Sequence, residues 1–291
     1  MIGSILATTT LYKDWYPGKL KNIADTDKVR GDQALETIKT AVDLGYIVIV
    51  ADRLSPQEFV EELSSTGAVI EIESESKRSP GRRRVFTRAS TIPGTRAIIW
   101  TEAEKTDLIK HLPALCLPVI ENEADLVIPK REEALFKASY PRYMYESEIV
   151  ANRLTNKFFR KYSLLAQSDL DLDIFFGPRV FSQETIRLAL DRYKLVDERK
   201  TYRNEFIDPE EYLNTTYFPV VAALFQRKKV ISVTIPFKYP ETQRQNEETA
   251  SEGNIEIFKE YRRNQRKGLM QGMIEFARYL RNEKSIITIE D

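Results

Sequence analysis

Residues 97–105 read Ala97-Ile98-Ile99-Trp100-Thr101-Glu102-Ala103-Glu104-Lys105, an apolar run followed by two acids with one residue between them. The apolar run predicts a buried strand. If the chain stays extended beyond it, Glu102 and Glu104 lie on the same face and could share one divalent cation at the carboxyl end of the strand. The alternative is a helix start, because Thr101 and Glu104 also have the spacing of a capping box.

Strands and helices are expected to alternate on both sides of this stretch. Apolar or alternating runs predict strands at residues 2–10, 46–51, 68–72, 96–100, 124–129 and 230–237. Amphipathic or capped segments predict helices at residues 32–44, 55–64, 82–90, 105–112, 147–161, 182–193 and 256–281. Polar composition predicts a loop at residues 240–253. Strands separated by single helices indicate parallel βαβ units, which bind ligands at the carboxyl ends of their strands.

Composition excludes several classes of protein. The chain has 44 basic and 44 acidic residues, a balance that argues against binding nucleic acid by neutralising its phosphates. One cysteine, Cys116, and one histidine, His111, exclude an internal disulfide and a zinc site built from these residue types. A lone histidine also leaves no partner set for a serine or cysteine nucleophile. We expect no signal peptide, no transmembrane segment and a location in the cytoplasm.

Polar residues that could hold phosphates follow the first predicted strand. Thr9 and Thr10 end that strand, and Lys28-Val29-Arg30-Gly31-Asp32 is expected to be a loop that brings two cations to the start of a helix. A helix start of this kind attracts anions. The alternative is a solvated turn in which Asp32 caps the helix.

Two further groups come next along the chain. Asp52 directly follows the second strand, where an acid can accept hydrogen bonds from a ribose or a base, although a cap by Ser55 explains part of this pattern. In residues 77–84, a Pro-Gly turn delivers Arg82, Arg83 and a third arginine into a helix start, and arginine suits diphosphates. A solvated charged face is the alternative, and no interleaved aromatic residues support RNA binding.

The last group is Asp169-Leu170-Asp171-Leu172-Asp173-Ile174-Phe175-Phe176-Gly177-Pro178-Arg179. Its three acids share one face if the segment is extended, and such a cluster needs solvent, partners or a catalytic use. Asp173, beside two aromatic residues, is the candidate general base. The alternative is the polar face of an edge strand.

In this order, the segments resemble the nucleotide-sugar half of GT-A-type glycosyltransferases, especially family-two-like members. Asp52-Arg53-Leu54-Ser55 is similar to the Asp-Asp-x-Ser signature after the second strand of that family. Glu102-Ala103-Glu104 stands where the family has its metal-binding Asp-x-Asp. Other stretches resemble a little-characterised fungal and microbial group of such proteins: Trp15-Tyr16-Pro17-Gly18, Lys28-Val29-Arg30-Gly31-Asp32, residues 100–105, residues 124–131 and residues 172–179.

The resemblance implies an α/β fold of the GT-A, Rossmann-like type, with a mixed, mainly parallel sheet flanked by helices and a C-terminal helix. It implies one domain over residues 1–291, with a nucleotide-sugar half (1–105), an acceptor half (106–240) and a loop with a helix (241–291). The expected reaction transfers a sugar from a nucleoside diphosphate sugar to an unknown acceptor, with inversion slightly favoured over retention. Asp173 would then deprotonate the acceptor. The expected donor site comprises Thr9, Thr10, Lys28, Arg30, Asp52, Arg82, Arg83, Glu102 and Arg179, and Glu102 and Glu104 would hold Mn²⁺ or Mg²⁺.

Two differences from the family pattern motivate an alternative. Glutamates replace the usual aspartates, and no histidine follows His111 to serve as a third metal ligand. The alternative is a non-catalytic protein that binds nucleotides or nucleotide sugars and retains the fold. A nucleotidyltransferase is disfavoured, because no glycine-rich loop with a trailing arginine follows the first strand.

The predicted helix at residues 256–281 carries a cationic group formed by Arg262, Arg263, Arg266 and Lys267. It could cap the acceptor site, pair two subunits in a homo-oligomer or contact an anionic membrane surface. A solvated helix packed on the core is the favoured expectation.

Overall fold

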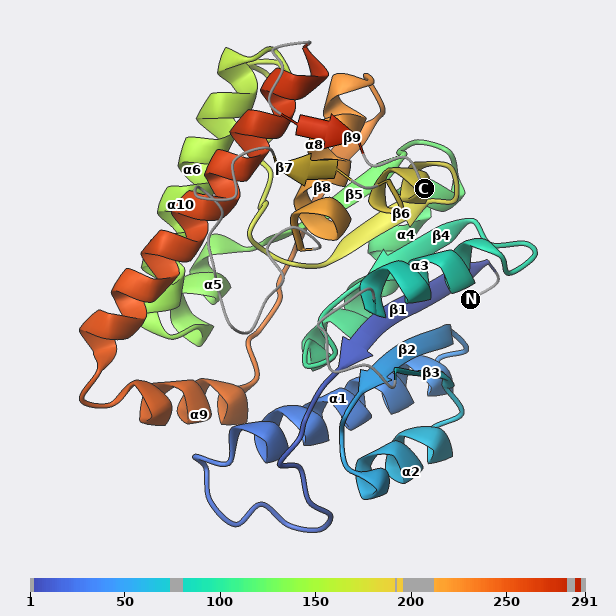
Figure 1. Cartoon of the computed structure of the whole chain (residues 1–291), viewed down its shortest axis with the longest axis vertical. Helices are drawn as coiled ribbons and strands as arrows, with labels where there is room; N and C mark the ends of the chain where they lie inside the picture. Colours follow the sequence, from blue (N-terminus) through green and yellow to red (C-terminus); the bar gives the residue numbers. More distant parts are fainter. Residues whose placement is uncertain (1–2, 74–80, 192, 196–211, 282–285, 289–291) are drawn as a thin grey trace.

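The structure is a computed structural model that describes residues 3–73, 81–191, 193–195, 212–281 and 286–288. Its centre is a seven-stranded sheet in the order β3-β2-β1-β4-β6-β5-β8 (Figure 1). The strands are β1 (Ser4–Thr10), β2 (Ile47–Arg53), β3 (Val69–Glu73), β4 (Ala97–Trp100), β5 (Leu126–Arg131), β6 (Arg179–Ser182) and β8 (Val230–Ile235). A separate two-stranded sheet pairs β7 (Tyr193–Leu195) with β9 (Ile286–Thr288).

Strand β6 is the antiparallel member of the large sheet. It runs opposite to both neighbours, β4 and β5, whereas β1, β2, β3 and β4 pair in parallel, as do β5 and β8. The carboxyl ends of the parallel strands therefore meet at one edge, and β6 brings its amino end to the same edge. Trp100 pairs with Arg179 there, so the segment before β6 lies next to the acids that follow β4.

Helices cover both faces of the sheet, as the alternation of strands and helices predicted. Because side chains alternate along a strand, Ile5 and Leu6 of β1 enter two different cores. The core that contains Ile5 also contains residues of α3, α6, α8 and α10, and the core that contains Leu6 also contains residues of α1, α2 and α4. The helices are α1 (Thr26–Asp43), α2 (Gln57–Ser65), α3 (Gly81–Ser90), α4 (Leu112–Ile120), α5 (Glu133–Ser139), α6 (Arg142–Lys161), α8 (Phe218–Phe225), α9 (Glu241–Ser251) and α10 (Ile255–Leu280).

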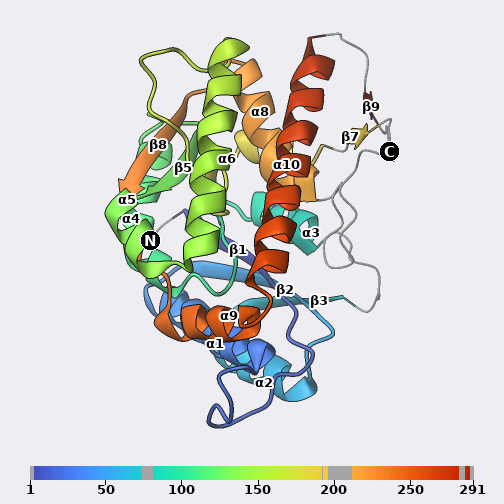
Figure 2. The ribbon, with the colours of Figure 1, turned by 90° about the vertical axis from the view of Figure 1, so that its left-hand side faces the viewer.

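Helices α6 and α10 lie side by side along one side of the molecule, and α9 crosses their lower end next to α1 (Figures 1 and 2). The last part of the chain therefore returns to the first helix. In the part of the chain that the structure describes, no helix combines the length and the apolar character needed to cross a bilayer.

Helix α1 begins at Thr26, six residues before the predicted start at Asp32. Lys28 and Arg30 are therefore on a helix and not in a loop. Gly31 lies inside this helix at a point of close contact. A Cβ atom at Gly31 would lie 2.3 Å from Cδ1 of Trp15, so only glycine lets this ring pack on the helix.

The loop predicted for residues 240–253 is wrong, because this segment forms α9. The helix begins after Pro240 and carries a side-chain pair at i, i+4 spacing, Arg244 Nε to Glu248 Oε1 at 2.9 Å. Its buried face is polar and includes Asn246, whose amide donates to the carbonyl oxygen of Ile23 at 2.7 Å. Apolar periodicity could not reveal a helix that buries polar residues.

The helix predicted for residues 182–193 is also wrong where the structure describes it. Strand β6 occupies Arg179–Ser182, and a short 3₁₀ turn follows at Thr185–Ala189. The capping contact that suggested a helix does exist, because the backbone N–H of Thr185 donates to Ser182 Oγ at 3.1 Å. It caps one turn only, and residue 192 lies outside the described residues.

The single thiol is expected to be inert in the folded protein. Cys116 is buried on α4, and burial raises the pKa of its thiol to about 12, so little thiolate forms near neutral pH. Ellman's reagent at about pH 8 should label the protein only after guanidinium unfolds it. Rapid labelling of the native protein would contradict this placement of α4.

Candidate active site

Two adjoining cavities lie at the carboxyl edge of the sheet. The first cavity, about 210 Å³, lies over the ends of β1, β2 and β4 and is bordered by Thr9, Thr10, Tyr12, Asp27, Arg53 and Trp100. The second cavity, about 450 Å³, is bordered by residues of α6, α9 and α10. Four residues border both cavities: Arg30, Arg82, Glu102 and Glu104. The two acids of residues 97–105 therefore lie at the junction.

Glu102 is held at the junction by backbone contacts and by a glycine. Thr8 Oγ1 donates to the carbonyl oxygen of Thr101 at 2.8 Å, which fixes the chain just after β4. A Cβ atom at Gly177 would lie 1.9 Å from Glu102 Oε1, so Gly177 forms a cradle that only glycine leaves open. Glu102 Oε2 is buried without a hydrogen-bond partner among the described residues. One carboxylate oxygen therefore has unused capacity to bind a ligand.

The capping-box alternative for Thr101 and Glu104 is not realised. Thr101 Oγ1 donates to the carbonyl oxygen of Glu102 at 3.0 Å and so does not cap a helix. The next helical turn is a 3₁₀ segment at Thr106–His111, and its N-cap residue, Lys105, makes no capping hydrogen bond with its side chain.

The charge of Glu104 raises the pKa of two neighbours, Tyr12 and Arg30. Burial, followed by the charge of Glu104, raises the pKa of Tyr12 well above its ordinary value. Burial alone would lower the pKa of Arg30, but Glu104 and Glu247 raise it, so this guanidinium stays charged. Arg30 Nη2 lies 3.2 Å from Glu247 Oε1 on α9. Arg30 thus connects the acids of the junction to the wall of the second cavity.

The residues at the junction suit a divalent cation that a ligand helps to hold. Carboxylate oxygens are the ligands that Mg²⁺ and Mn²⁺ prefer, and Glu102 offers an unpartnered oxygen beside Glu104. Among the described residues, no group of three acids, histidines or cysteines could hold a metal alone. Any ion here would need phosphate oxygens or water to complete its coordination shell.

Arg82 lies against two aromatic rings at the same junction. Its guanidinium carbon is 4.7 Å from the ring centre of Trp100 and 4.4 Å from that of Tyr212. Its Nη1 donates to Thr216 Oγ1 at 2.9 Å. These contacts fix a cation whose position suits a diphosphate. Residues 77–80 of the predicted cationic segment lie outside the described residues.

Thr9 and Thr10 border the first cavity, and Asp52 binds the side chain of Thr10. The carboxylate of Asp52 is buried and accepts hydrogen bonds from Thr10 Oγ1 and Ser55 Oγ, each at 2.7 Å. The backbone N–H of Ser55 also donates to it, at 3.3 Å. With its oxygens already engaged, Asp52 is better suited to fixing the ends of β1 and β2 than to contacting a nucleoside.

Lys105 projects its charge into an aromatic part of the second cavity. Its Nζ lies 5.5 Å from the ring centre of Phe176 and 5.6 Å from that of Tyr239. Burial alone would lower the pKa of Lys105, but Tyr140 and Glu102 raise it above its ordinary value. The ammonium group is therefore a fixed positive charge next to the junction.

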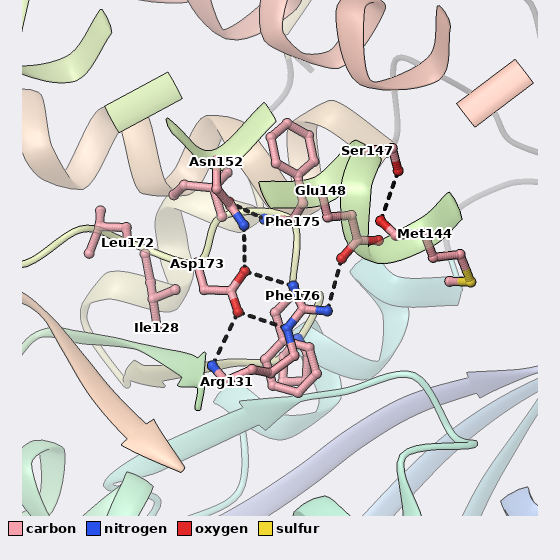
Figure 3. A network of polar contacts seen from close by, with 12 residues as sticks. Ile128, Arg131, Met144, Ser147, Glu148, Asn152, Leu172, Asp173, Phe175 and Phe176 are labelled. Atoms are coloured by element: carbon pink, nitrogen blue, oxygen red, sulfur yellow. Dashed lines mark hydrogen bonds and ion pairs between the residues drawn. The ribbon is translucent and has the colours of Figure 1, made fainter. Parts of the chain in front are cut away.

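Asp173 does not have the environment of a general base (Figure 3). Arg131 binds both of its oxygens, with Nε to Oδ2 and Nη2 to Oδ1 at 2.8 Å each, and Asn152 Nδ2 donates to Oδ1 at 2.7 Å. Burial would raise the pKa of Asp173, but Arg131 holds it below its ordinary value. A carboxylate that is so well stabilised is a weak proton acceptor. The predicted base is therefore reinterpreted as a structural anion.

The three acids Asp169, Asp171 and Asp173 do not share one face. Asp171 pairs with Arg160 at 2.6 Å and is exposed, whereas Asp169 accepts the backbone N–H of Ala166 at 2.7 Å. The segment forms turns before β6, so the alternation seen in the sequence does not correspond to an extended strand.

Three cations predicted to bind the donor have internal partners instead. Lys28 is buried, pairs with Asp32 at 2.7 Å and lies over the ring of Trp15. Arg179 is fully buried and donates to backbone carbonyl oxygens, including that of Ile174 at 2.6 Å. Arg83 donates to the carbonyl oxygens of residues 189–191. Buried charges need such partners, so the contacts of these three cations are accounted for within the protein.

Several residues of the second cavity were not predicted as site residues. Glu148 on α6 lies between Arg131, at 2.9 Å, and Arg266 of α10. Tyr261, Arg262 and Gln265 of α10 also border this cavity, as do Tyr140, Tyr239 and Glu247. For the residues of α10, the sequence offered one indication, namely that the C-terminal helix could cap an acceptor site. Arg266 is buried in an ion pair, so it is not part of an exposed cationic face.

Comparison with known proteins supports the fold and not a specific activity. No family model and no curated protein sequence matches the chain. A glucosyl-3-phosphoglycerate synthase from Mycobacterium tuberculosis, in complex with Mn²⁺, UDP-glucose and phosphoglyceric acid, is similar in structure at 12% identity with a TM-score of 0.50, over 96% of this chain and 79% of that one. The same enzyme with Mn²⁺, UDP and glucosyl-3-phosphoglycerate gives 12% identity and a TM-score of 0.48, over 86% and 79% of the two chains.

At this low identity the likeness concerns the arrangement of strands and helices alone. The mixed, mainly parallel sheet, the helices on both faces and the C-terminal helix agree with that neighbour over almost the whole chain. The chain therefore has a GT-A-type, Rossmann-like fold, as the sequence predicted.

Proposed function

We propose that the protein is a glycosyltransferase that moves a sugar from a nucleoside diphosphate sugar to the hydroxyl group of an acceptor. The observation that carries this proposal is the pair of cavities that meet at Glu102, Glu104, Arg30 and Arg82. Transfer between two substrates needs two binding spaces with the reacting atoms at their boundary. Here the boundary carries both acids and cations, as a diphosphate leaving group requires.

The first cavity would hold the nucleoside diphosphate. It lies at the carboxyl edge of parallel strands, where α/β folds bind nucleotides, and Thr9, Thr10 and Trp100 border it. Arg30 and Arg82 would contact the phosphates. The structural neighbour was crystallised with UDP-glucose, which makes UDP the first nucleotide to test.

Glu102, with Glu104 beside it, would hold Mn²⁺ or Mg²⁺. When bound, such an ion stabilises the negative charge that develops on a departing diphosphate. The chain supplies Arg30, Arg82 and Lys105 for the same purpose, as fixed positive charges at or next to the junction. The second cavity would bind the acceptor and exclude bulk water. Direct displacement, with inversion at the anomeric carbon, is the mechanism that we favour.

The proposal predicts that UDP-glucose is consumed in the presence of Mn²⁺. Thermal shift with UDP, GDP, ADP and CDP should first identify the base, because a bound ligand raises the melting temperature. Release of the nucleoside diphosphate from the matching sugar donor, with water as a slow acceptor, should then be measurable by a coupled assay. Stabilisation without any release would favour the alternative, a non-catalytic nucleotide-binding protein. No stabilisation by any nucleotide would contradict both.

A further inference from the structure

Glu247 is a buried carboxylate that borders the second cavity from α9, the helix that the sequence did not predict. It is 8% exposed. Its neighbour in sequence, Glu248, is exposed and pairs with Arg244. Two consecutive acids therefore have opposite environments, and the inward-facing one needs an explanation, because burying a charge is costly.

The two oxygens of Glu247 are not equivalent. Oε1 accepts a hydrogen bond from Tyr239 Oη at 2.7 Å, lies 3.2 Å from Arg30 Nη2 and accepts a longer contact from Gln243 Nε2 at 3.5 Å. Oε2 is buried without a hydrogen-bond partner among the described residues. Tyr239, Arg30 and Gln243 thus orient the carboxylate and leave one oxygen for a donor that the protein does not supply. A hydroxyl group in the cavity is such a donor.

The other acids near this cavity are already engaged. Burial would raise the pKa of Glu148, but Arg266 and Arg131 hold it below its ordinary value. Asp173 is neutralised by Arg131 in the same way. Glu102 and Glu104 lie at the junction, where the donor phosphates and a cation would occupy them. Glu148 Oε2 also lacks a hydrogen-bond partner, but it lies 2.9 Å from Arg131 Nη1 in an ion pair. Among the described acids that border the second cavity and not the first, Glu247 is therefore the one with an oxygen that has neither a hydrogen bond nor an ion pair.

We propose that Glu247 binds the acceptor hydroxyl and removes its proton, an inference that rests on the proposed transferase function. As the acceptor oxygen forms its bond to the anomeric carbon, the bond from that carbon to the diphosphate oxygen breaks, and its electron pair leaves with the diphosphate. The hydroxyl proton passes to Glu247 Oε2 and then to water. Glu247 thereby takes the role that the sequence suggested for Asp173. A carboxylate in this role typically contributes about 10²- to 10⁴-fold to the rate.

The test compares Glu247→Gln with Glu248→Gln in the full chain. Turnover is measured as release of UDP from UDP-glucose with Mn²⁺, with water as acceptor, and UDP affinity is measured by calorimetry. We expect Glu247→Gln to lose about 10²- to 10⁴-fold in turnover while it keeps the UDP affinity of the parent. Glu248→Gln should match the parent in both measurements.

The variant Glu247→Asp guards against a folding defect. It keeps a negative charge beside Arg30 but withdraws the carboxylate by one methylene group, so it should fold and still lose turnover. A Glu247→Gln or Glu247→Asp variant that binds UDP and turns over within about threefold of the parent would overturn the assignment of Glu247 alone. A parent that binds UDP but releases none from UDP-glucose, or that does not bind UDP, would overturn both this assignment and the use of UDP-glucose.

Discussion

Glu102→Gln is expected to remove the gain in UDP affinity that Mn²⁺ produces. The glutamine has the same shape and can occupy the cradle formed by Gly177, so the fold should be kept. It lacks the negative charge and one of the two acceptor oxygens that a divalent cation requires. Calorimetric titration of UDP should show that Mn²⁺ raises the affinity of the parent for UDP. In the variant, the affinity for UDP in the presence of Mn²⁺ should be lower than that of the parent by more than about 100-fold.

The control for Glu102→Gln is Glu123→Gln, which changes an exposed acid beyond the end of α4, in the turn before β5. It has the same change in charge and should leave both titrations unchanged. Equal UDP affinities with and without Mn²⁺ in the parent would show that Arg30 and Arg82 bind the diphosphate without a metal. An unchanged gain in Glu102→Gln would remove this residue from the metal site.

Asp173→Asn is expected to affect stability far more than chemistry. Asp173 is 6% exposed and accepts three hydrogen bonds from Arg131, two from the guanidinium and one from the backbone N–H. The substitution leaves Glu148 as the one carboxylate among the described residues that neutralises Arg131 and Arg266. Breaking a buried ion pair by removing one partner costs about 3–5 kcal/mol. Urea unfolding, followed by circular dichroism, should show a loss of this size in the free energy of unfolding. UDP affinity measured well below the melting temperature should be retained.

The matched control is Asp171→Asn, which changes an acid in the same loop and breaks its ion pair with Arg160 of α6. The side chain of Asp171 is 54% exposed, and such surface pairs contribute about 0–1 kcal/mol. If Asp173→Asn unfolded at the same urea concentration as the parent but lost all turnover, Asp173 would be the base and Glu247 would not.

The same network should make the protein less stable in acid. The pKa values of Asp173 and Glu148 are lower in the folded protein than their ordinary values, because arginines neutralise both groups despite burial. The unfolded chain therefore binds more protons than the folded one as the pH falls below the ordinary carboxylate pKa of about 4. The stability that these two acids contribute is complete above that pH and is lost as the pH falls toward their lower folded values.

The sheet could be predicted from the sequence because its strands bury apolar residues on both faces. Residues 97–100 and 46–51 are continuous apolar runs. Strands that are separated by single helices pair in parallel, so their carboxyl ends could be placed at one edge of the sheet. This placed Glu102, Glu104, Arg30, Arg82 and the two threonines near one another, and the structure places them around the two cavities. Their roles as ligands remain predictions.

Side chains that bind other parts of the chain could not be distinguished from ligand-binding ones. Lys28, Arg179 and Asp173 have the residue types that bind substrates, but each is satisfied by a partner whose position only the fold defines, such as Arg131 for Asp173. Helix α9 was missed for a related reason, because it buries Asn246 and Glu247 and shows no apolar stripe. The wall of the second cavity therefore could not be predicted from local patterns.

A crystal structure of the protein with UDP and Mn²⁺ would test the central claim most directly. We predict that UDP lies in the first cavity with its phosphates beside Arg30 and Arg82, and that Mn²⁺ is found at Glu102. The anomalous signal of manganese would identify the ion and distinguish it from water. UDP bound elsewhere, or bound at this edge with the second cavity filled by its own phosphates, would contradict the assignment of the two cavities to donor and acceptor.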